Sequence, residues 1–302
     1  MGGSPPAVIV HHTAVYHFSF NVRASHFPTF DGGSWRGVDF SSFALGCCFL
    51  YNVGMKNFRQ WHEDNCFFRE DELFFGRCDV QHRLSLSEIL LITSDTAVQD
   101  YHVRGFTYDV LKENNFAILV SRASFKINKM PMVNDMVTVR TWEEAPAGLQ
   151  LSRKYEILDK DGKVLISGSS LWIVVNPESR RIVKPDQFTI RELPITKTEF
   201  EGIPCGKISI PENTDLLDER VIRYTDLDAN GHMNNSRYGS YIMDCLPEDL
   251  RSKNMTNFRI NYSQEATLGD KLHLYGAFSD SNKFVIVGKT DKVTCFEAEL
   301  HF

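Results

Sequence analysis

The chain has 302 residues, of which 42% are hydrophobic and 24% are charged, a composition typical of a globular protein with a sizeable core. Its formal net charge of −6 and its pI of about 5.9 argue against non-specific nucleic-acid binding, which usually shows as a strong basic excess. No apolar run approaches the ~20 residues that a membrane-spanning helix needs, so we expect no membrane span.

The first 54 residues differ from the rest of the chain. They hold only two acidic and two basic residues, no lysine, and seven of the 22 phenylalanines, and they show no sustained helical or strand period. We interpret residues 1–54 as a poorly ordered extension, or as upstream sequence translated from an early start codon. We assign no function to this segment. It contains four histidines, which we interpret as no more than an adventitious metal site: His11, His12, His17 and His26.

From about residue 67 the chain reads as two similar halves. The first half opens with a strand-like run at 72–80, and a helix follows in which Ser85 and Glu88 have the spacing of a capping box. This helix has an apolar helical period and ends at Gly105. Four strand candidates follow, and a DKDG turn joins the last two as a hairpin: 116–127, 135–144, 149–158 and 163–175.

The second half repeats this order in shorter form. A strand candidate at 218–228 precedes a helix candidate at 235–246, for which Asn235 is the predicted N-cap. Four further strand candidates complete this half: 257–264, 270–278, 283–290 and 293–302. Each half therefore reads as a strand, a long helix and about four antiparallel strands.

The two halves align without gaps around the entry to the helix. Asp79, Gln81 and Arg83 fall opposite Asp228, Asn230 and His232, and further on Asp135 falls opposite Asp270. A repeat of this size indicates a duplicated α+β unit. One helix wrapped by an antiparallel sheet resembles a hotdog domain. We therefore expect a tandem (double) hotdog fold, with an N-terminal domain at 55–205 and a C-terminal domain at 206–302 that pair as a pseudo-dimer.

The most informative stretch for function is YTDLDANGHMNNSRYGSY, residues 224–241. It gathers six acidic, amide and imidazole side chains directly before the second helix: Asp226, Asp228, Asn230, His232, Asn234 and Asn235. Asp, Asn and Gly are also ordinary turn formers, so a purely structural polar loop is the alternative. His232 is not needed for such a turn, and its counterpart in the first half is Arg83. This asymmetry is expected where only one of two equivalent sites is active.

The string DLDANGHMNN resembles the Asp-x-Asn-x-His-x-Asn-Asn active-site motif of the acyl-acyl carrier protein (acyl-ACP) thioesterase family, which starts the central helix of the second hotdog. The likeness covers roughly residues 67–302, and the first-half segments RCDVQHRLSLSEIL and NFAILVSRASFKINKMPMVNDMVTVRTW resemble bacterial members. The resemblance implies hydrolysis of the thioester bond of fatty acyl-ACP to release free fatty acid, which terminates or diverts fatty acid synthesis.

The resemblance also implies the catalytic residues Asp228, Asn230, His232 and Glu265. On this interpretation Glu265 lies in a mostly apolar cleft and deprotonates a water, His232 assists proton transfer, Asn230 positions the water or carbonyl, and Asp228 orients its neighbours. Two points stay open: which of Glu265 and His232 is the principal base, and whether an acyl-glutamate intermediate forms. We expect the backbone N–H groups at the start of the second helix, near Asn235, to stabilise the oxyanion.

Cysteine chemistry and cofactors are not expected. Seven cysteines are present without a CxxC pair, and we predict reduced, mostly buried thiols. Many plant members of the family carry a cysteine directly after the glutamate, but this chain has Ala266, which excludes a Cys–His mechanism at that place. The sequence has no H-x-x-x-H helix or glycine-rich phosphate loop, so we expect neither a metal nor an organic cofactor.

The family likeness implies an apolar acyl tunnel and a docked carrier protein. Candidate tunnel segments are Ile89–Val110 and Phe116–Ile127, which are otherwise ordinary core. Because the carrier protein is typically acidic, we expect a basic docking patch, although each candidate can equally be an ordinary solvated charge. The candidates are Arg122, Lys126, Lys129, Arg153, Lys154, Arg180, Arg181 and Lys184.

Two other functions remain in competition with this one. A hotdog thioesterase that acts on acyl-coenzyme A shares the fold and most of the mechanism, and a hotdog module with a decayed site binds an acyl chain without catalysis. A hotdog dehydratase fits less well, because such enzymes do not carry this asparagine-rich string. We expect a monomer (the pseudo-dimer) or a homodimer, located in the cytoplasm, or in the plastid stroma if the chain comes from a plant.

Overall fold

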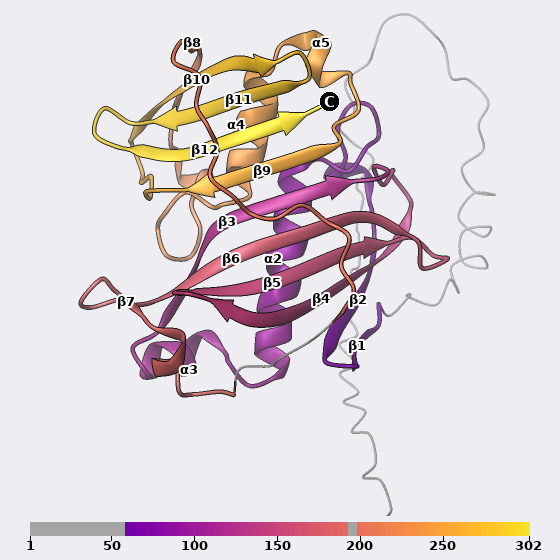
Figure 1. The fold of residues 1–302 in the computed structure, drawn as a ribbon, viewed down its shortest axis with the longest axis vertical. Coiled ribbons are helices and arrows are strands. Elements are labelled where there is room, and N and C mark those ends of the chain that lie inside the picture. The colour runs from indigo at the N-terminus through magenta and orange to yellow at the C-terminus, as the bar shows by residue number, and fades with distance from the viewer. Residues whose placement is uncertain (1–57, 193–197) are drawn as a thin grey trace, which may run out of the picture. The chain divides into compact units, whose positions relative to one another are not determined.

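The structure is a computed structural model that describes residues 58–192 and 198–302. The predicted extension at 1–54, with its histidines, lies outside the described residues. The described chain forms one 12-stranded antiparallel sheet, with the helices α2 and α4 on the same side of it (Figure 1). The strand order is β1-β2-β4-β5-β6-β3-β9-β12-β11-β10-β8, and β7 pairs with β6.

The first half supplies seven of these strands and the longer central helix. In chain order its elements are β1 (Gln60–Glu63), β2 (Cys66–Glu72), α2 (Leu86–Val103), α3 (Tyr108–Glu113), β3 (Ala117–Ile127), β4 (Met136–Ala147), β5 (Gln150–Leu158), β6 (Val164–Asn176) and β7 (Arg181–Val183). The strands β3 to β6 confirm the four strand candidates of this half. The segments β1, α3 and β7 were not predicted, since they are too short to show a period.

The second half repeats the arrangement with a shorter helix. Its elements are β8 (Asp215–Val221), α4 (Arg237–Cys245), α5 (Glu248–Arg251), β9 (Asn257–Tyr262), β10 (Lys271–Asp280), β11 (Lys283–Lys289) and β12 (Thr294–His301). The strands β9 to β12 again confirm the candidates. A tandem hotdog, with each half built as a helix against an antiparallel sheet, is therefore the observed architecture (Figure 1).

Helix α2 begins where the capping signal predicted. The Ser85 hydroxyl accepts a hydrogen bond from the Glu88 backbone N–H at 3.4 Å, but the Glu88 carboxylate accepts one from Arg77 instead of closing the capping box. The last helical residue is Val103 and the C-cap is Arg104, and Gly105 follows with a φ of 90°, a conformation that favours glycine.

Two predicted strands are wrong over most of their length, because only Glu72 of the run at 72–80 and residues 218–221 of the run at 218–228 lie in strands. The run at 72–80 leaves the sheet after Glu72, and Phe75–Arg77 form a short 3-10 helix. In the same way β8 ends at Val221, and Tyr224–Asp226 form a 3-10 helix. In both places the apolar and aromatic residues that suggested a strand lie in a turn that carries the chain from the sheet to the helix.

The predicted N-cap of the second helix is also wrong. Helix α4 begins at Arg237, its N-cap position is Ser236, and this serine makes no side-chain capping hydrogen bond. The Asn234 side chain instead accepts hydrogen bonds from the Ser236 backbone N–H at 2.9 Å and from the Ser236 hydroxyl at 2.8 Å. The amide one residue earlier therefore fixes the first turn.

The two halves share both the sheet and the helix layer. Strand β3 pairs with β9, which makes the sheet continuous from one half to the other. On the helix side α2 and α4 cross at Gly239, where an added Cβ would lie 2.9 Å from the Ser87 Cα atom. Because that contact is with backbone, only glycine allows the helices to approach this closely.

The segment 198–214 joins the halves across the face of the sheet opposite to the helices (Figure 1). The Ser124 hydroxyl donates a hydrogen bond to the carbonyl oxygen of Ile203 at 2.8 Å, and Arg259 donates one to the carbonyl oxygen of Pro204 at 3.1 Å. Ile208 is buried against Val285 and Val287. This connection thus covers strands of both halves.

Candidate active site

The loop before α4 is built around the Asp228 carboxylate. Its Oδ1 atom accepts hydrogen bonds from the backbone N–H groups of Asn230 at 2.8 Å and of His232 at 3.3 Å. Gly231 sits between them with a φ of 79°, which favours glycine. The His232 backbone then pairs with Thr267 in an isolated bridge, which brings the loop against the β9–β10 connection.

This pairing brings His232 and Glu265 together. The His232 Nε2 atom lies 3.4 Å from the Glu265 Oε2 atom, and the two side chains are 35% and 37% exposed. The separation is longer than a typical charge-assisted hydrogen bond of about 2.7–2.9 Å. Catalytic contacts are often this loose without substrate. The Glu265 side chain, at 37% exposed, is half-buried.

Glu265 has a second partner that sequence reasoning had placed elsewhere. The Arg180 Nη2 atom lies 3.2 Å from the same Oε2 atom, and Arg180 comes from the connection between β6 and β7 in the first half. Its side chain is 80% exposed, so the ion pair is well solvated. Residues from both halves therefore meet at Glu265.

A groove of about 780 Å³ opens at this cluster, a volume in the usual range for a small-molecule site. Asn230, His232, Glu265 and Arg180 line it, together with residues of α2, α3, β3 and β6. Both segments predicted as tunnel lining contribute, the first through Ala97–Asp109 and the second through Phe116–Leu119. Trp172, Val175 and Pro177 at the end of β6 were not expected there.

Asp228 does not line this groove, unlike the other three predicted site residues. It lines a smaller cavity of about 130 Å³ together with Asn234, Asn235 and Ser236 at the start of α4. The backbone N–H groups of Ser236 and Arg237 are already bonded to Asn234. The start of α4 thus lines a different cavity from the one that holds His232 and Glu265, and Asn230 is the amide that faces the groove.

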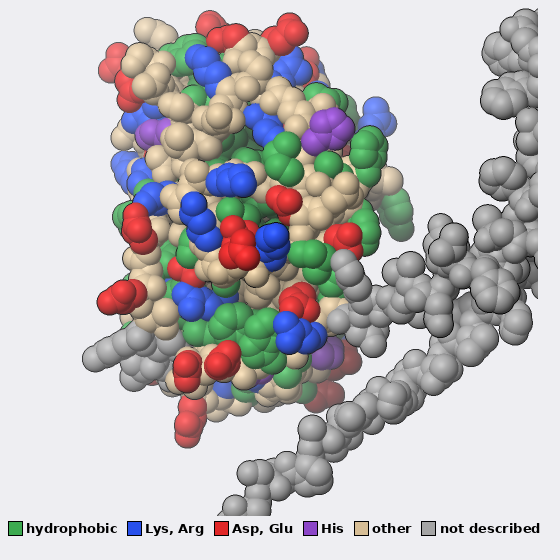
Figure 2. Space-filling view, turned by 90° about the vertical axis from the view of Figure 1, so that its right-hand side faces the viewer, with side chains coloured by type: hydrophobic (Ala, Val, Ile, Leu, Met, Phe, Trp, Pro, Cys, Tyr) green, Lys and Arg blue, Asp and Glu red, His purple; other side chains and the backbone are tan. Residues whose placement is uncertain are grey.

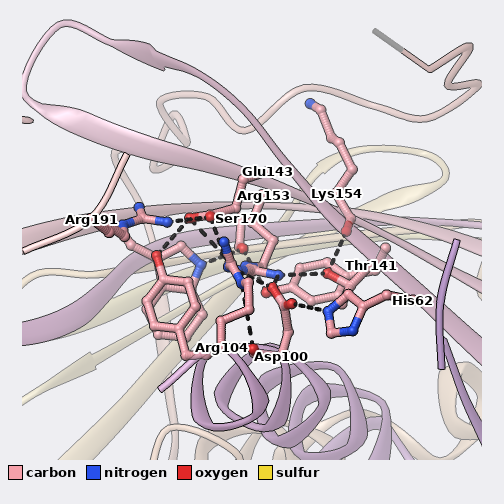
Figure 3. Close-up of polar contacts among 12 residues, drawn as sticks. His62, Asp100, Arg104, Thr141, Glu143, Arg153, Lys154, Ser170 and Arg191 are labelled. Atoms are coloured by element: carbon pink, nitrogen blue, oxygen red, sulfur yellow. Dashed lines mark hydrogen bonds and ion pairs between the residues drawn. The ribbon is translucent and has the colours of Figure 1, made fainter. Parts of the chain in front are cut away.

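A network of buried charges also contributes to the lining of the groove, and sequence reasoning missed it. Glu143 on β4 and Arg153 on β5 are 4% and 3% exposed, face each other across the two strands, and both line the groove. The Tyr101 hydroxyl donates a hydrogen bond to Glu143 Oε1 at 2.5 Å. Figure 3 shows Asp100 and Arg104 reaching from the helix towards this pair.

The network also includes Asp100, Arg104 and Arg191. Asp100 Oδ2 accepts from Arg153 and from Arg104, each at 2.8 Å, and Arg104 also lies 3.0 Å from Glu143 Oε2. Arg191 forms an ion pair with the same Glu143 oxygen. Burial alone would raise the pKa of Glu143, but the guanidinium groups of Arg153 and Arg191 outweigh burial and lower this pKa to about 2.

The signal for this network was present in the strand alternation. Glu143 is in phase with Val137 and Val139 on β4, and Arg153 is in phase with Tyr155 and Ile157 on β5, so both face the helix. Arg153 was instead predicted as part of an exposed docking patch. Its 3% exposure makes that prediction wrong.

Three of the other candidate docking residues lie beside carboxylates. Lys126 pairs with Glu201, Lys154 lies 3.5 Å from Glu144, and Arg180 is held at Glu265. On the face drawn in Figure 2 the basic and acidic side chains of the described residues alternate, without a broad area of one sign. A single basic docking patch is therefore not evident on that face.

The cysteines of the described chain lie away from this chemistry. Burial raises the pKa of all five thiols, which disfavours the reactive thiolate: Cys66, Cys78, Cys205, Cys245 and Cys295. None of the five lines the groove, and Ala266 next to Glu265 is 1% exposed. In residues 58–192 and 198–302, no three His, Cys, Asp or Glu side chains are grouped to hold a metal ion.

Comparison with known families decides what kind of protein this is. The model of the acyl-ACP thioesterase N-terminal domain matches residues 64–189, and the model of the C-terminal domain of the same family matches residues 211–296. The chain belongs to the acyl-ACP thioesterase family. The two matched segments coincide with the two hotdog halves, and the second contains the loop with His232 and Glu265.

Relatives of this acyl-ACP thioesterase family member are distant in sequence. A chloroplastic acyl-[acyl-carrier-protein] hydrolase of Cuphea viscosissima is 22% identical over 197 residues, which are 60% of this chain and 47% of the relative. The chain thus spans about half the length of the curated relatives that it matches.

Two solved structures have the same fold. An acyl-ACP thioesterase from Bacteroides thetaiotaomicron superposes with a TM-score of 0.68 at 24% identity, over 79% of this chain and 98% of the other. The 12:0-ACP thioesterase from Umbellularia californica superposes with a TM-score of 0.66 at 18% identity, over 80% and 98%. Both confirm the double hotdog. Of the helices in the described part of this chain, none combines the length and apolar character needed to cross a membrane.

Proposed function

We propose that this protein hydrolyses the thioester bond of fatty acyl-ACP and releases free fatty acid, which terminates or diverts fatty acid synthesis. The observation that carries the proposal is the pairing of His232 and Glu265, 3.4 Å apart, at a groove of about 780 Å³ lined largely by aromatic and aliphatic side chains. An imidazole and a carboxylate supply a base and a proton carrier, and the groove supplies space for an acyl chain.

The proposed reaction begins with a water that Glu265 orients and deprotonates. The water oxygen attacks the thioester carbon, and the carbonyl oxygen becomes an oxyanion. Collapse of this intermediate breaks the C–S bond. The proton that Glu265 took from the water passes to His232, which delivers it to the leaving thiolate of the carrier group. The products are a fatty acid and a free thiol. In one alternative His232 is the principal base and Glu265 assists. In another, the Glu265 carboxylate itself attacks the thioester carbon and forms an acyl-glutamate.

Asn230 and Asp228 have supporting roles in this proposal. Within the described chain the Asn230 side-chain amide has no protein hydrogen-bond partner, and it lines the groove beside His232. Its N–H donors are therefore placed to bind the carbonyl oxygen. Asp228 is a positioning residue, because its carboxylate holds the backbone N–H groups of Asn230 and His232 and so fixes the direction of both side chains.

We propose the same division of labour between the domains as the sequence indicated. The N-terminal domain, residues 55–205, shapes the acyl site and keeps a degenerate copy of the loop. The C-terminal domain, residues 206–302, carries the catalytic residues. One chain holds both halves of the groove, which is consistent with a monomer and does not conflict with a homodimer. The proposed partner is the acyl carrier protein. The proposed location is the cytoplasm, or the plastid stroma if the chain comes from a plant.

A thioester panel tests the proposal. Purified protein is incubated with acyl-ACPs of several chain lengths and with the matching acyl-coenzyme A thioesters, and thiol and fatty acid release are measured with and without Glu265→Gln. Fast release from the carrier-protein substrates that the variant loses supports the proposal. Release from coenzyme A alone assigns the protein to the acyl-coenzyme A thioesterases, and release from neither makes it a binding module.

A further inference from the structure

The groove at His232 and Glu265 has an uneven lining. Around α3, β3 and β6 it is mostly apolar, with Leu111, Phe116, Ile118 and Trp172 among its lining residues. Near Tyr101 the lining includes Glu143 and Arg153. Among the described residues that line this groove, these two are the charged side chains that are nearly fully buried. This buried ion pair therefore forms a charged wall in a groove whose other lining is largely apolar.

This wall is specific to the first half of the molecule. Glu143 and Arg153 are opposite each other on β4 and β5, and the equivalent opposite pair on β10 and β11 is Phe278 and Phe284, whose rings pack edge to face at 4.9 Å. A fold of this type thus accepts an apolar pair at this position. The ions are not required by the hotdog architecture itself.

The wall offers hydrogen-bond donors beyond those it uses. Arg153 Nη2 and Arg191 Nε are buried and have no hydrogen-bond partner among the described residues, with Glu143 Oε1 at 3.6 Å from Arg153 Nη2. Figure 3 shows the guanidinium groups converging on the two carboxylates of Asp100 and Glu143. Three guanidinium groups, of Arg104, Arg153 and Arg191, face these two carboxylates. The network therefore has one more guanidinium group than carboxylates, and Arg153 is the one of the three arginines that lines the groove.

We propose that this ion network is the end wall of the acyl site, and that it selects acyl chains by their far end. Methyl-ended chains long enough to reach the wall are disfavoured, whereas chains of the same length that end in a hydroxyl group are accepted. The inference rests on the proposed thioesterase function and names the substrate class of that site.

The physical reason is the cost of covering a charge. A methyl end pressed onto Glu143 and Arg153 removes the 4% and 3% of their side-chain surface that is still exposed, and it returns no hydrogen bond. A hydroxyl end replaces the lost water, because its oxygen accepts from a guanidinium N–H and its hydrogen is donated to a carboxylate. In a site with an apolar end wall the order is reversed, since a buried hydroxyl without partners is penalised.

The first test uses the unmodified protein. kcat/KM is measured on methyl-ended acyl-ACPs that lengthen by two carbons at a time, and on the matching chains with a hydroxyl group at the far end. We expect kcat/KM for methyl-ended chains to fall at one length, and the hydroxyl-ended chain of that length to exceed its methyl-ended partner by about tenfold or more. A hydroxyl penalty at every length would overturn the inference while leaving the thioesterase function in place.

The second test changes the wall. In the double variant Glu143→Gln/Arg153→Met we expect the longest accepted methyl-ended chain to lengthen and the hydroxyl preference to shrink. The matched control is Glu156→Gln/Arg140→Met, because these two residues are also opposite each other on β4 and β5 and form a partly buried ion pair outside the groove. An unchanged chain-length profile in a folded wall variant, or the same change in the control, would contradict the proposal.

The two failures are distinguishable. If no acyl-ACP is hydrolysed at any length, the proposed function itself is wrong. If the wall variant does not fold, the hydroxyl comparison in the unmodified protein still decides, because it requires no substitution.

Discussion

The two halves of this molecule contain the same loop with different side chains. In the first half the Asp79 carboxylate accepts hydrogen bonds from the backbone N–H groups of Gln81 and Arg83, as Asp228 does for Asn230 and His232. The left-handed position between them is His82 in one loop, with a φ of 63°, and Gly231 in the other, with a φ of 79°. The backbone frame is therefore independent of the chemistry that it carries.

The two loops differ in the contacts of the side chain at the equivalent position, Arg83 in the first and His232 in the second. Arg83 bonds to Asp79 and donates to the carbonyl oxygens of Arg251 and Lys253 in the second half, so it ties the halves together. His232 points instead towards Glu265, whose counterpart by the loop alignment is Met130. One copy of the loop thus became a structural link, and the other kept an imidazole and a carboxylate in reach of the groove.

The inner faces of the two half-sheets differ in the same way. Helix α2 spans 18 residues and α4 only 9. The extra turns of α2 place Asp100, Tyr101 and Arg104 over Glu143 and Arg153, whereas in the second half Phe278 remains 50% exposed. The longer helix is what turns the first half into a covered groove with a charged wall.

The largest expected effect is on kcat, and it follows from substitution of His232 or Glu265, the pair that the first half lacks. His232→Ala and Glu265→Gln should each lower kcat on acyl-ACP by on the order of 100-fold or more, because each removes a proton-transfer group. His273→Ala is the matched control, since His273 and Glu219 form a partly exposed imidazole–carboxylate pair at 2.8 Å on β10 and β8, away from the groove. Near-normal turnover in the His232 variant would remove that residue from the mechanism.

The charged wall should be visible in acid stability. The folded pKa of Glu143 is lowered from 4.5 to about 2, so its carboxylate stabilises the fold above pH 4.5 and this stabilisation is lost as the pH falls towards 2. We expect Glu143→Gln to lower the free energy of unfolding by about 3 kcal/mol at neutral pH. The difference from the unmodified protein should shrink below pH 4.5 in urea titrations. A difference that stays constant with pH would mean that ionisation of Glu143 is not its source.

A medium effect is expected at the structural copy of the loop. Arg83→Ala leaves two carbonyl oxygens and the Asp79 carboxylate without their donor, which should cost about 2 kcal/mol of unfolding free energy. In a denaturant titration the midpoint should fall, while kcat of the folded variant stays within about twofold of normal. A loss of kcat as large as that of His232→Ala would show that the first loop also takes part in catalysis.

The smallest effect is expected at Arg180, which links the halves at Glu265. The pair is 80% and 37% exposed, and such solvated ion pairs contribute about 0–1 kcal/mol. We expect Arg180→Ala to change kcat/KM no more than about fivefold, with the residual effect vanishing at high salt. A much larger loss that persists in salt would make Arg180 part of substrate binding.

The sequence alone determined the elements and the repeat. Strand candidates at 116–127 and 163–175, and the helix that begins after Ser85, follow from side-chain periodicity and capping, which are local properties. The spacing of Asp228, Asn230 and His232 also follows from a local turn, because one carboxylate organises the loop. Such features need no knowledge of distant contacts.

Only the tertiary structure decided which distant side chains meet. Glu265 reaches His232 because the β9–β10 connection pairs with the helix-entry loop, and Arg180 reaches Glu265 from the other half. Arg153 looked like a surface charge until β4, β5 and α2 enclosed it with Glu143 and Asp100. Burial and ion pairing depend on the packing of segments far apart in the chain, and no short window of sequence contains that information.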